Sequence, residues 1–227
     1  MLSVELHAHS ALSHDGRDPV EALLERAEAV GLDGLAVTDH DAIEASLEAE
    51  RLAPEYGLVG IPGMEVSSAA GHVLALGVRD LVPAGLPFEE TVARIRDQGG
   101  VAVVPHPFQR SRHGVARRID RDTLATADAI EVFNSRLLTG IANRRARNFA
   151  AARDLPMTAG SDAHIKEMIG RAATDLATDE RSVEAVLDAI RDGRTSVTGR
   201  RTPWHVSVRQ AAGGAKRRVI RRVADLW

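Results

Sequence analysis

The sequence contains no cysteine, and this absence removes several classes of site at once. Without a thiol, the chain forms no disulfide, no thiolate zinc site, no iron–sulfur cluster and no cysteine nucleophile. A bound metal would have to be held by His, Asp and Glu. At 227 residues the chain has the length of one domain, and it can bury a core without a disulfide or a structural metal.

Long apolar runs and Gly-rich phosphate loops are also missing. No apolar run reaches the roughly twenty residues that a membrane-spanning helix needs, and the N-terminus lacks the regions of a signal peptide. We therefore expect no membrane span and a cytoplasmic protein. No GxGxxG motif follows a predicted strand, and the GGAK sequence near residue 216 lacks the spacing and the Ser or Thr of a P-loop. Nucleotide binding by a Gly-rich loop is not expected.

Lysine is scarce, and the basic residues are unevenly distributed. Residues 200–227 carry eight Arg or Lys and one acidic residue, Asp225, so this segment has a charge of +7. The whole chain has a net charge of -3, which leaves -10 for residues 1–199. We expect a domain over residues 1–199 and a separate basic C-terminal segment. The acidic body argues against stable nucleic-acid binding.

The end of the basic segment predicts an amphipathic helix over residues 215–227. Its apolar residues recur at helical spacing opposite Lys216 and four arginines. They are Val219, Ile220, Val223, Leu226 and Trp227. Such a helix either packs its apolar face on the domain or lies on an anionic membrane or a partner. The acidic body favours packing on the domain.

Short apolar runs alternate with helix-like stretches over residues 1–199. Strands are predicted at 3–9, 34–39, 57–68, 72–78, 101–106, 129–134, 156–162 and 195–199. Helices are predicted at 19–30, 42–55, 88–98, 141–153 and 182–191. The first helix has Asp18 as its expected N-cap and Pro19 at its first position. The alternation favours an α/β fold with a mostly parallel sheet, either a β/α barrel or, as the alternative, a doubly wound open sheet.

Histidines and carboxylates gather where the predicted strands end, which in a β/α barrel is the active-site face. Seven of the nine His lie at or just beyond such an end. His7 and His9 are two residues apart on the first strand, so they point to the same side and can bind one metal. Asp162 and His164 have the same spacing. Further candidates are Asp39, His40, Glu65, His72, His106 and Glu131.

A lone histidine such as His113 or His205 is more often an ordinary surface or core residue. The larger group is different, because each unpaired buried charge costs several kcal/mol unless a cation compensates it. Nitrogen and oxygen ligands suit Zn, Mn, Fe or Ni. We therefore predict two or three divalent ions, with Zn, Mn and Fe as the first choices.

Four motifs together resemble those of the polymerase and histidinol phosphatase (PHP) superfamily. They are HAHS with the downstream SHDG, TDHD, the tripeptide Pro105–Pro107 and GSDAH, supported by GMEVSS and GHVLALG. The similarity covers about residues 1–199. It implies a distorted (β/α)7 barrel, related to the TIM barrel, with a trinuclear metal centre at the carboxyl-terminal rim and phosphoesterase activity.

The resemblance also implies a role for each ligand. It puts His7, His9, Glu65 and Asp162 on the first metal, Glu65 as a bridge with His72 and His106 on the second, and Asp15, His40 and His164 on the third. His14 is the alternative to Asp15, which is favoured because SHDG aligns with the commoner Ser-Asp-Gly form. Asp39 is expected to orient a ligand. The role of Glu131 stays open.

The charge of such a centre favours a phosphate substrate. Three divalent ions bring +6 and the carboxylates of Asp15, Glu65 and Asp162 return -3, so the site attracts an anion. A metal-bound hydroxide, with its pKa lowered toward about 7, would attack phosphorus. Arginine side chains commonly complete such sites. The arginine candidates are Arg110, Arg136 and Arg171, and we predict Asp162, His164, Arg136 and Arg171 as the catalytic residues.

We therefore predict a phosphoesterase for a small phosphorylated metabolite or nucleotide, either a phosphomonoesterase or a phosphodiesterase. One alternative is an amidohydrolase-type C–N hydrolase, which also uses HxH but bridges its ions with a carbamylated lysine. The chain has no lysine at a predicted strand end, so Glu65 would have to substitute. Another alternative is a non-catalytic or proofreading-like nucleic-acid accessory module. The intact ligand set argues against it.

Overall fold

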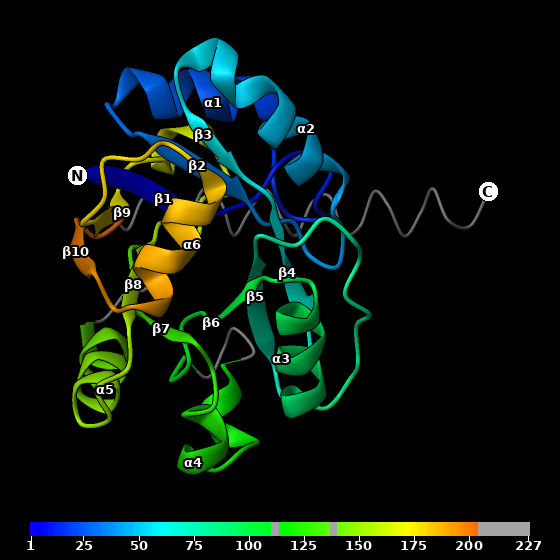
Figure 1. The fold of residues 1–227 in the computed structure, drawn as a ribbon, viewed down its shortest axis with the longest axis vertical. Helices are drawn as coiled ribbons and strands as arrows, with labels where there is room; N and C mark the ends of the chain where they lie inside the picture. Colours follow the sequence, from blue (N-terminus) through cyan, green and yellow to red (C-terminus); the bar gives the residue numbers. More distant parts are fainter. Residues whose placement is uncertain (110–113, 137–139, 204–227) are drawn as a thin grey trace.

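The computed structural model describes residues 1–109, 114–136 and 140–203, and within them ten strands form two five-stranded sheets (Figure 1). The first sheet has the order β10-β9-β1-β2-β3: Thr195–Gly199, Ala172–Leu176, Leu2–Ala8, Gly34–Val37 and Val59–Ile61. The second has the order β4-β5-β6-β7-β8: Gly63–Ser67, His72–Leu76, Val101–Val104, Ala129–Asn134 and Met157–Gly160. The predicted C-terminal helix, Arg110, His113 and His205 lie outside the described residues.

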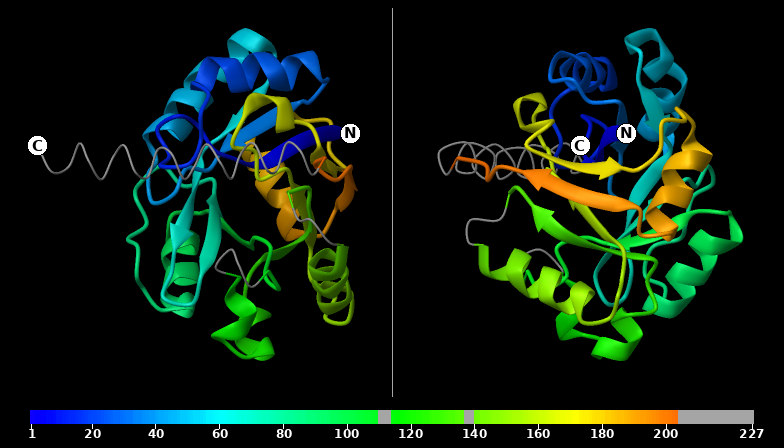
Figure 2. Two further views of the ribbon diagram at one scale, coloured as in Figure 1. Left: turned by 180° about the vertical axis from the view of Figure 1, so that it is seen from behind. Right: turned by 60° about the vertical axis from the view of Figure 1, so that its left-hand side comes forward.

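The α/β class is confirmed, but the sheets are mixed and not mostly parallel. β1, β2 and β3 run parallel, as do β6, β7 and β8. β9 and β10 join the first sheet antiparallel, and β5 is antiparallel to both β4 and β6. The connection from β4 to β5 spans only residues 68–71, too short for the crossover that parallel strands require. Figure 2 shows β10 beside β9.

Two isolated parallel bridges link the sheets, Ala8 with Ala163 and His40 with Glu65. They lie at the carboxyl ends of β1 and β2, where the first sheet meets β8 and β4 of the second. Strand pairing among the described residues does not close the two sheets into a single barrel. The seven-stranded barrel therefore stays a prediction.

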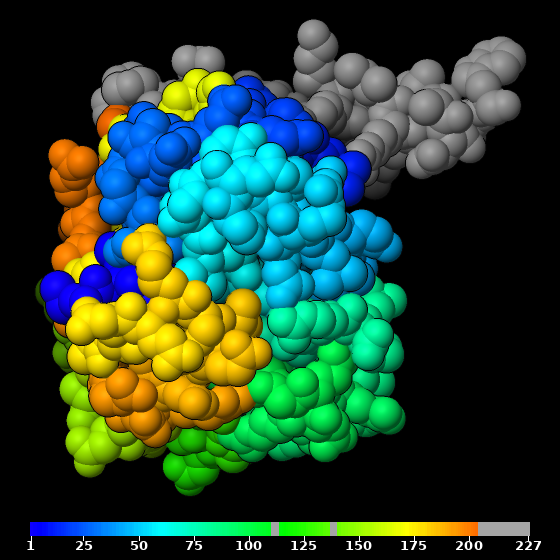
Figure 3. Space-filling view, turned by 45° about the horizontal axis from the view of Figure 1, so that its top comes forward, coloured from blue at the N-terminus to red at the C-terminus, as the bar shows by residue number. Residues whose placement is uncertain are grey.

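Helices cover the outer faces of the sheets. α1 (Val20–Ala29) and α2 (Glu44–Leu52) pack with the first sheet and form one continuous surface near α6 (Val183–Arg191) in Figure 3. α3 (Phe88–Asp97) and α5 (Gly140–Ala151) pack on the second sheet. The short helix α4 spans Arg121–Leu124, and 3-10 turns lie at Ala53–Tyr56 (η1), Val115–Arg117 (η3) and Lys166–Met168 (η4).

A third apolar cluster joins the two sheets to α6 and includes Leu6, Ile61, Leu74, Val103 and Ile190, all at most 1% exposed. This packed interior fixes the strands whose ends carry the predicted ligands. Among the described residues, no helix is both long enough and apolar enough to span a bilayer.

Three local predictions were wrong. Asp18 does not cap the first helix: Pro19 is the N-cap, and Asp18 Oδ2 instead accepts a hydrogen bond from the backbone N–H of Lys166 at 2.8 Å. The single strand predicted at 57–68 is two strands, β3 and β4, separated at Pro62, which has no N–H to donate to a ladder. β9 was missed altogether.

Candidate metal centre

All nine predicted metal ligands meet at one edge of the fold. β1, β2, β6 and β8 end there, which brings in the residues of the HxH, TDHD, PHP and GSDAH motifs. β5 is antiparallel to β6, so its first residue, His72, lies at the same edge. The ligand atoms fall into five groups of three, each within 4.8 Å: His7, His106 and Asp162; His7, His9 and Glu65; His9, Asp15 and His40; His9, Asp162 and His164; and His40, Glu65 and His72.

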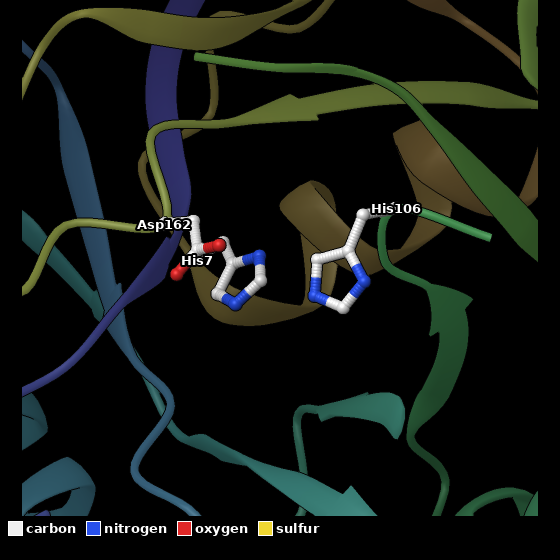
Figure 4. Close-up of side chains that lie close together, drawn as sticks. All are labelled: His7, His106 and Asp162. Atoms are coloured by element: carbon white, nitrogen blue, oxygen red, sulfur yellow. The ribbon is translucent and has the colours of Figure 1, made fainter. Parts of the chain in front are cut away.

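Glu65 lies at the centre, and its carboxylate is 1% exposed. Its Oε2 is 3.4 Å from His7 Nε2, 3.3 Å from His9 Nε2 and 3.4 Å from His40 Nδ1. Its Oε1 is 2.7 Å from His72 Nδ1 and 3.5 Å from His106 Nε2. The two oxygens therefore face different sets of imidazoles, the arrangement that a bridging carboxylate needs. Figure 4 shows His7 beside Asp162 with His106 across from them.

Asp15 joins the outer part of the cluster. Its Oδ2 is 2.6 Å from His164 Nε2 and 3.6 Å from His40 Nε2. Asp162 Oδ1 lies 3.3 Å from His164 Nδ1 and 3.8 Å from His9 Nε2. His14 is exposed, and its ring packs on His40 with centroids 4.8 Å apart. Asp15, and not His14, belongs to the groups of converging ligand atoms.

Glu131 contacts two of the predicted ligands, His7 and His106. Its Oε1 is 2.9 Å from His7 Nδ1, and its Oε2 accepts hydrogen bonds from the backbone N–H of His106 and from Asn134 Nδ2, each at 2.9 Å. A carboxylate accepts, so Nδ1 of His7 donates a proton to Glu131, and Nε2 is the ring nitrogen that faces the centre. Asp39 accepts from the backbone N–H of Ser10 at 2.6 Å, so it contacts the residue after His9 and no predicted ligand ring.

Sequence reasoning missed Glu5 and Asn134. Glu5 is fully buried and accepts hydrogen bonds from the backbone N–H of Ser161 at 2.8 Å and of His7 at 3.2 Å. Burial raises the pKa of Glu5 to about 7. The signal was present, because Glu5 precedes His7 and His9 with the same spacing of two. Asn134 ends β7, and no spacing marks it.

The donor set fits divalent cations. Nε2 of His7, both ring nitrogens of His9 and Nδ1 of His106 are buried and have no hydrogen-bond partner among the described residues. Leaving each unsatisfied costs about 1–3 kcal/mol, which a cation would remove. His106 and Asp162 also adopt left-handed backbone, with φ of 32° and 53°. Such strain collects at functional sites.

Charges within the cluster shift several pKa values. Burial alone would raise the pKa of Glu65, but His40, His72 and His7 hold it well below its usual range. The pKa of Asp15 is also lowered, against its burial, by hydrogen bonds to His164 and His40. Burial alone would lower the pKa of His40, yet Glu65 and Asp15 raise it to about 9.

The imidazoles of His7 and His164 shift in opposite directions. Burial would lower the pKa of His7, but Glu131 and Glu65 raise it well above its usual value. The pKa of His164 is lowered to about 4 by burial and by the charge of Arg136. The cluster therefore holds two imidazoles with raised pKa values, His40 and His7, and one, His164, that is neutral near pH 7.

The predicted arginines differ in their relation to the site. Arg136 reaches it, with NH1 2.9 Å from Asp162 Oδ1. Arg171 comes directly before β9, and its Nε is buried without a hydrogen-bond partner among the described residues. A role for Arg171 in the site stays a prediction.

Known proteins resemble this chain in both sequence and fold. An uncharacterized protein of Methanocaldococcus jannaschii is 32% identical over 169 residues, 70% of this chain and 96% of the relative. Residues 140–195 match the PHP-associated family, PHP_C. The chain belongs to the PHP superfamily.

Two further similarities concern a shorter sequence segment and the fold. A phosphoribosyl 1,2-cyclic phosphate 1,2-diphosphodiesterase of Eggerthella lenta is 37% identical over 86 residues, 35% of this chain and 32% of that protein. A two-domain protein of Bacteroides vulgatus, described as containing a predicted PHP-like metal-dependent phosphoesterase, superposes with a TM-score of 0.74 at 22% identity. The match covers 88% of this chain and 65% of the other. At that identity the likeness concerns the fold.

Proposed function

We propose that this PHP chain is a metal-dependent phosphoesterase that hydrolyses a small phosphorylated metabolite or nucleotide. The observation that carries the proposal is the position of Glu65, whose two oxygens lie 2.7–3.5 Å from the rings of five histidines. Such an arrangement suits two or more ions that share one carboxylate. The phosphodiesterase name of the Eggerthella lenta relative supports a phosphate-ester substrate.

The proposed ligand sets are those that the resemblance to the PHP motifs implies, and each of the nine residues belongs to at least one group of converging atoms. His7, His9, Glu65 and Asp162 would hold one ion, Glu65, His72 and His106 a second, and Asp15, His40 and His164 a third. Zn, Mn and Fe all suit this donor set. When bound, divalent ions would activate water and stabilise the charge of the phosphoryl group.

Side chains beside the proposed ions would orient a ligand and bind the phosphate of the substrate. Glu131 accepts the hydrogen bond from His7 Nδ1 and so orients the ring with Nε2 toward the centre, where Nε2 would bind an ion. Arg136 is the proposed arginine for the phosphate, because its side chain is 18% exposed at the edge of the cluster. A planar guanidinium binds phosphate oxygens in pairs. Asp162 and His164 are proposed to act both as ligands and at the reacting group.

The barrel and the domain division belong to the same proposal. The bridges at Ala8 and His40 support a distorted seven-stranded ring, β1-β2-β4-β5-β6-β7-β8, with β3, β9 and β10 outside it. We propose residues 1–199 as the catalytic domain and 200–227 as an added basic segment. We also propose that the protein binds a small phosphorylated substrate and does not bind nucleic acid stably.

The test uses the full-length chain loaded separately with Zn²⁺, Mn²⁺ and Fe²⁺. Each preparation is assayed on p-nitrophenyl phosphate, bis(p-nitrophenyl) phosphate, a panel of phosphorylated metabolites and a simple cyclic amide. We expect phosphate-ester hydrolysis that chelation abolishes and added metal restores. Amide hydrolysis without phosphate-ester hydrolysis would favour the amidohydrolase alternative. Full activity of metal-free protein would overturn the proposal.

A further inference from the structure

The chain crosses the end of β7 directly after it leaves β10. A Cβ added to Gly199, the last residue of β10, would lie 2.7 Å from Cδ1 of Phe133 in β7, so glycine lets the chain pass close to that strand. Further on, the backbone N–H of Thr202 donates to the carbonyl oxygen of Ser135 at 2.7 Å, and Thr202 is buried. The first residues of the basic segment therefore pack against β7 and the residue that follows it.

Two hydroxyl groups connect this crossing to the GSDAH motif. Thr202 Oγ1 lies 3.0 Å from Ser135 Oγ, and Ser135 Oγ donates to the carbonyl oxygen of Ser161 at 3.0 Å. A serine hydroxyl has one proton, and Ser135 uses it on Ser161, so Thr202 donates and Ser135 accepts. The backbone N–H of Ser135 donates to the carbonyl oxygen of Gly160 at 3.2 Å. Fully buried Ser135 is thus held from β8 on one side and from Thr202 on the other.

Ser135 and Ser161 each precede a residue of the proposed site. Arg136, the proposed arginine for the phosphate, follows Ser135, and Asp162, a proposed ligand, follows Ser161. The backbone at Asp162 is left-handed, with φ of 53°, a conformation that persists only where the surroundings hold it. Because the Ser135 hydroxyl joins the two backbones, the position of Arg136 relative to Asp162 depends on this link.

We propose that Thr202 is a positioning residue that places Arg136 for the phosphate of a substrate. Its hydroxyl holds Ser135 against Ser161, and this contact fixes the backbone from which the arginine side chain extends. The inference rests on the proposed function, because it needs Arg136 to bind phosphate. Thr202 itself needs no contact with the substrate or with an ion, since it acts through Ser135. The working part of the chain then extends beyond residue 199 into the basic segment, as far as Thr202.

The test compares three variants of the full-length protein loaded with Mn²⁺. Thr202→Val removes the hydroxyl and keeps the shape of the side chain, Thr202→Ser keeps the hydroxyl, and Thr198→Val changes an exposed threonine of β10 as the control. In Thr202→Val we expect kcat/KM on p-nitrophenyl phosphate to fall about ten-fold and the calorimetric Kd for inorganic phosphate to rise about five-fold, because a displaced binding group loses its contacts with the phosphate. Metal content should not change, and the other two variants should stay within about two-fold of wild type.

A double-mutant cycle with Arg136→Gln separates positioning from a general loss of structure. If Thr202 acts through Arg136, Thr202→Val should change the phosphate Kd by less than about two-fold in the Arg136→Gln protein, since the effects of coupled residues do not add. An equal change in both backgrounds, or a loss in Thr202→Ser as large as in Thr202→Val, would rule out the inference.

A second variant, Ser135→Ala, breaks the same link at its other partner and should reproduce the loss of phosphate affinity. It takes the place of Thr202→Val if thermal unfolding shows that Thr202→Val does not fold, and unchanged phosphate binding in Ser135→Ala would contradict the inference. A wild-type protein that neither hydrolyses phosphate esters nor binds phosphate would instead overturn the proposed function, so the two failures are distinguishable.

Discussion

At the scale of single residues, Glu65 has the most partners in the cluster. Its Oε2 faces His7, His9 and His40, and its Oε1 faces His72 and His106. In Glu65→Gln one oxygen becomes an amide that donates hydrogen bonds and cannot bind a cation. We expect the loss of at least one equivalent of metal and a fall in turnover of about 100-fold or more, since even residues behind the ligands are worth 10–100-fold.

Elemental analysis and steady-state rates measure this effect. Glu89→Gln, on the exposed face of α3, is the matched control and should retain both metal and activity. Near wild-type metal content in Glu65→Gln would show that the carboxylate does not bridge.

Glu131 is a second residue-scale case, because it acts through its neighbours. Three donors converge on its two oxygens: His7 Nδ1, the backbone N–H of His106 and Asn134 Nδ2. Glutamine offers one oxygen, so Glu131→Gln leaves at least one donor without its acceptor. We expect metal affinity to fall 10–100-fold with the fold intact. Calorimetric titration checks the affinity and circular dichroism the fold. Unchanged affinity would remove Glu131 from the support of His7.

At the scale of elements, β8 approaches β1 and β7 so closely that it needs a glycine. A Cβ on Gly160 would lie 2.5 Å from His7 Cβ and 2.6 Å from Glu131 Oε1. Gly160→Ala should therefore push His7 and Glu131 out of place, costing about 1–3 kcal/mol of stability and the metal that His7 binds.

Unfolding curves and metal analysis test Gly160→Ala together. Gly85→Ala is the control, because Gly85 has φ of 80° but no atom within 4 Å of an added Cβ. It should cost about 1 kcal/mol through backbone strain and keep the metal. Full metal content in Gly160→Ala would mean that β8 can move away from β1 and β7 without displacing His7.

Local sequence patterns predicted some strands well and missed others. The spacing of two predicted the pair His7 and His9, of which His7 lies in β1 and His9 directly after it, and apolar runs located β6, β7 and β8 within a few residues. β9 was missed because its sequence, AATDL, offers one large apolar residue and is recognised only by its pairing with β1 and β10. Strand direction depended on connection length and tertiary pairing, which periodicity does not encode.

At the scale of the molecule, motifs predicted which residues meet but not how they are supported. The nine ligand candidates came from motif spacing, and the fold brings them to one edge. The hydrogen bond from the backbone of Ser161 to Glu5 joins residues 156 apart in the sequence, and the contact of Arg136 with Asp162 joins residues 26 apart. Such contacts follow from packing and leave no local signature.

Because the pKa values of His40 and Glu5 are raised, the free energy of unfolding of the metal-free protein should fall as pH rises from 6.5 to 8.5. The folded pKa of His40 is about 9, above its ordinary 6.5, so its stabilising contribution is complete below 6.5 and is lost as pH rises through 9. Glu5, with its pKa raised to about 7, acts in the same direction between 4.5 and 7. The lowered pKa values of Asp15, Glu65 and His164 leave their contributions constant in this window. His40 alone accounts for at most about 3 kcal/mol.

Bound metal should reverse this trend, because metal ligands must be deprotonated and binding strengthens with pH. The rise in Tm that saturating metal produces should therefore be larger at pH 8.5 than at pH 6.5. Thermal unfolding of stripped and loaded protein at both values measures it, with His40→Gln reducing the pH dependence of the stripped form. A stripped protein whose Tm increased over this range would contradict the electrostatic account, since the carboxylates around His40 would then not be holding its proton in the folded state.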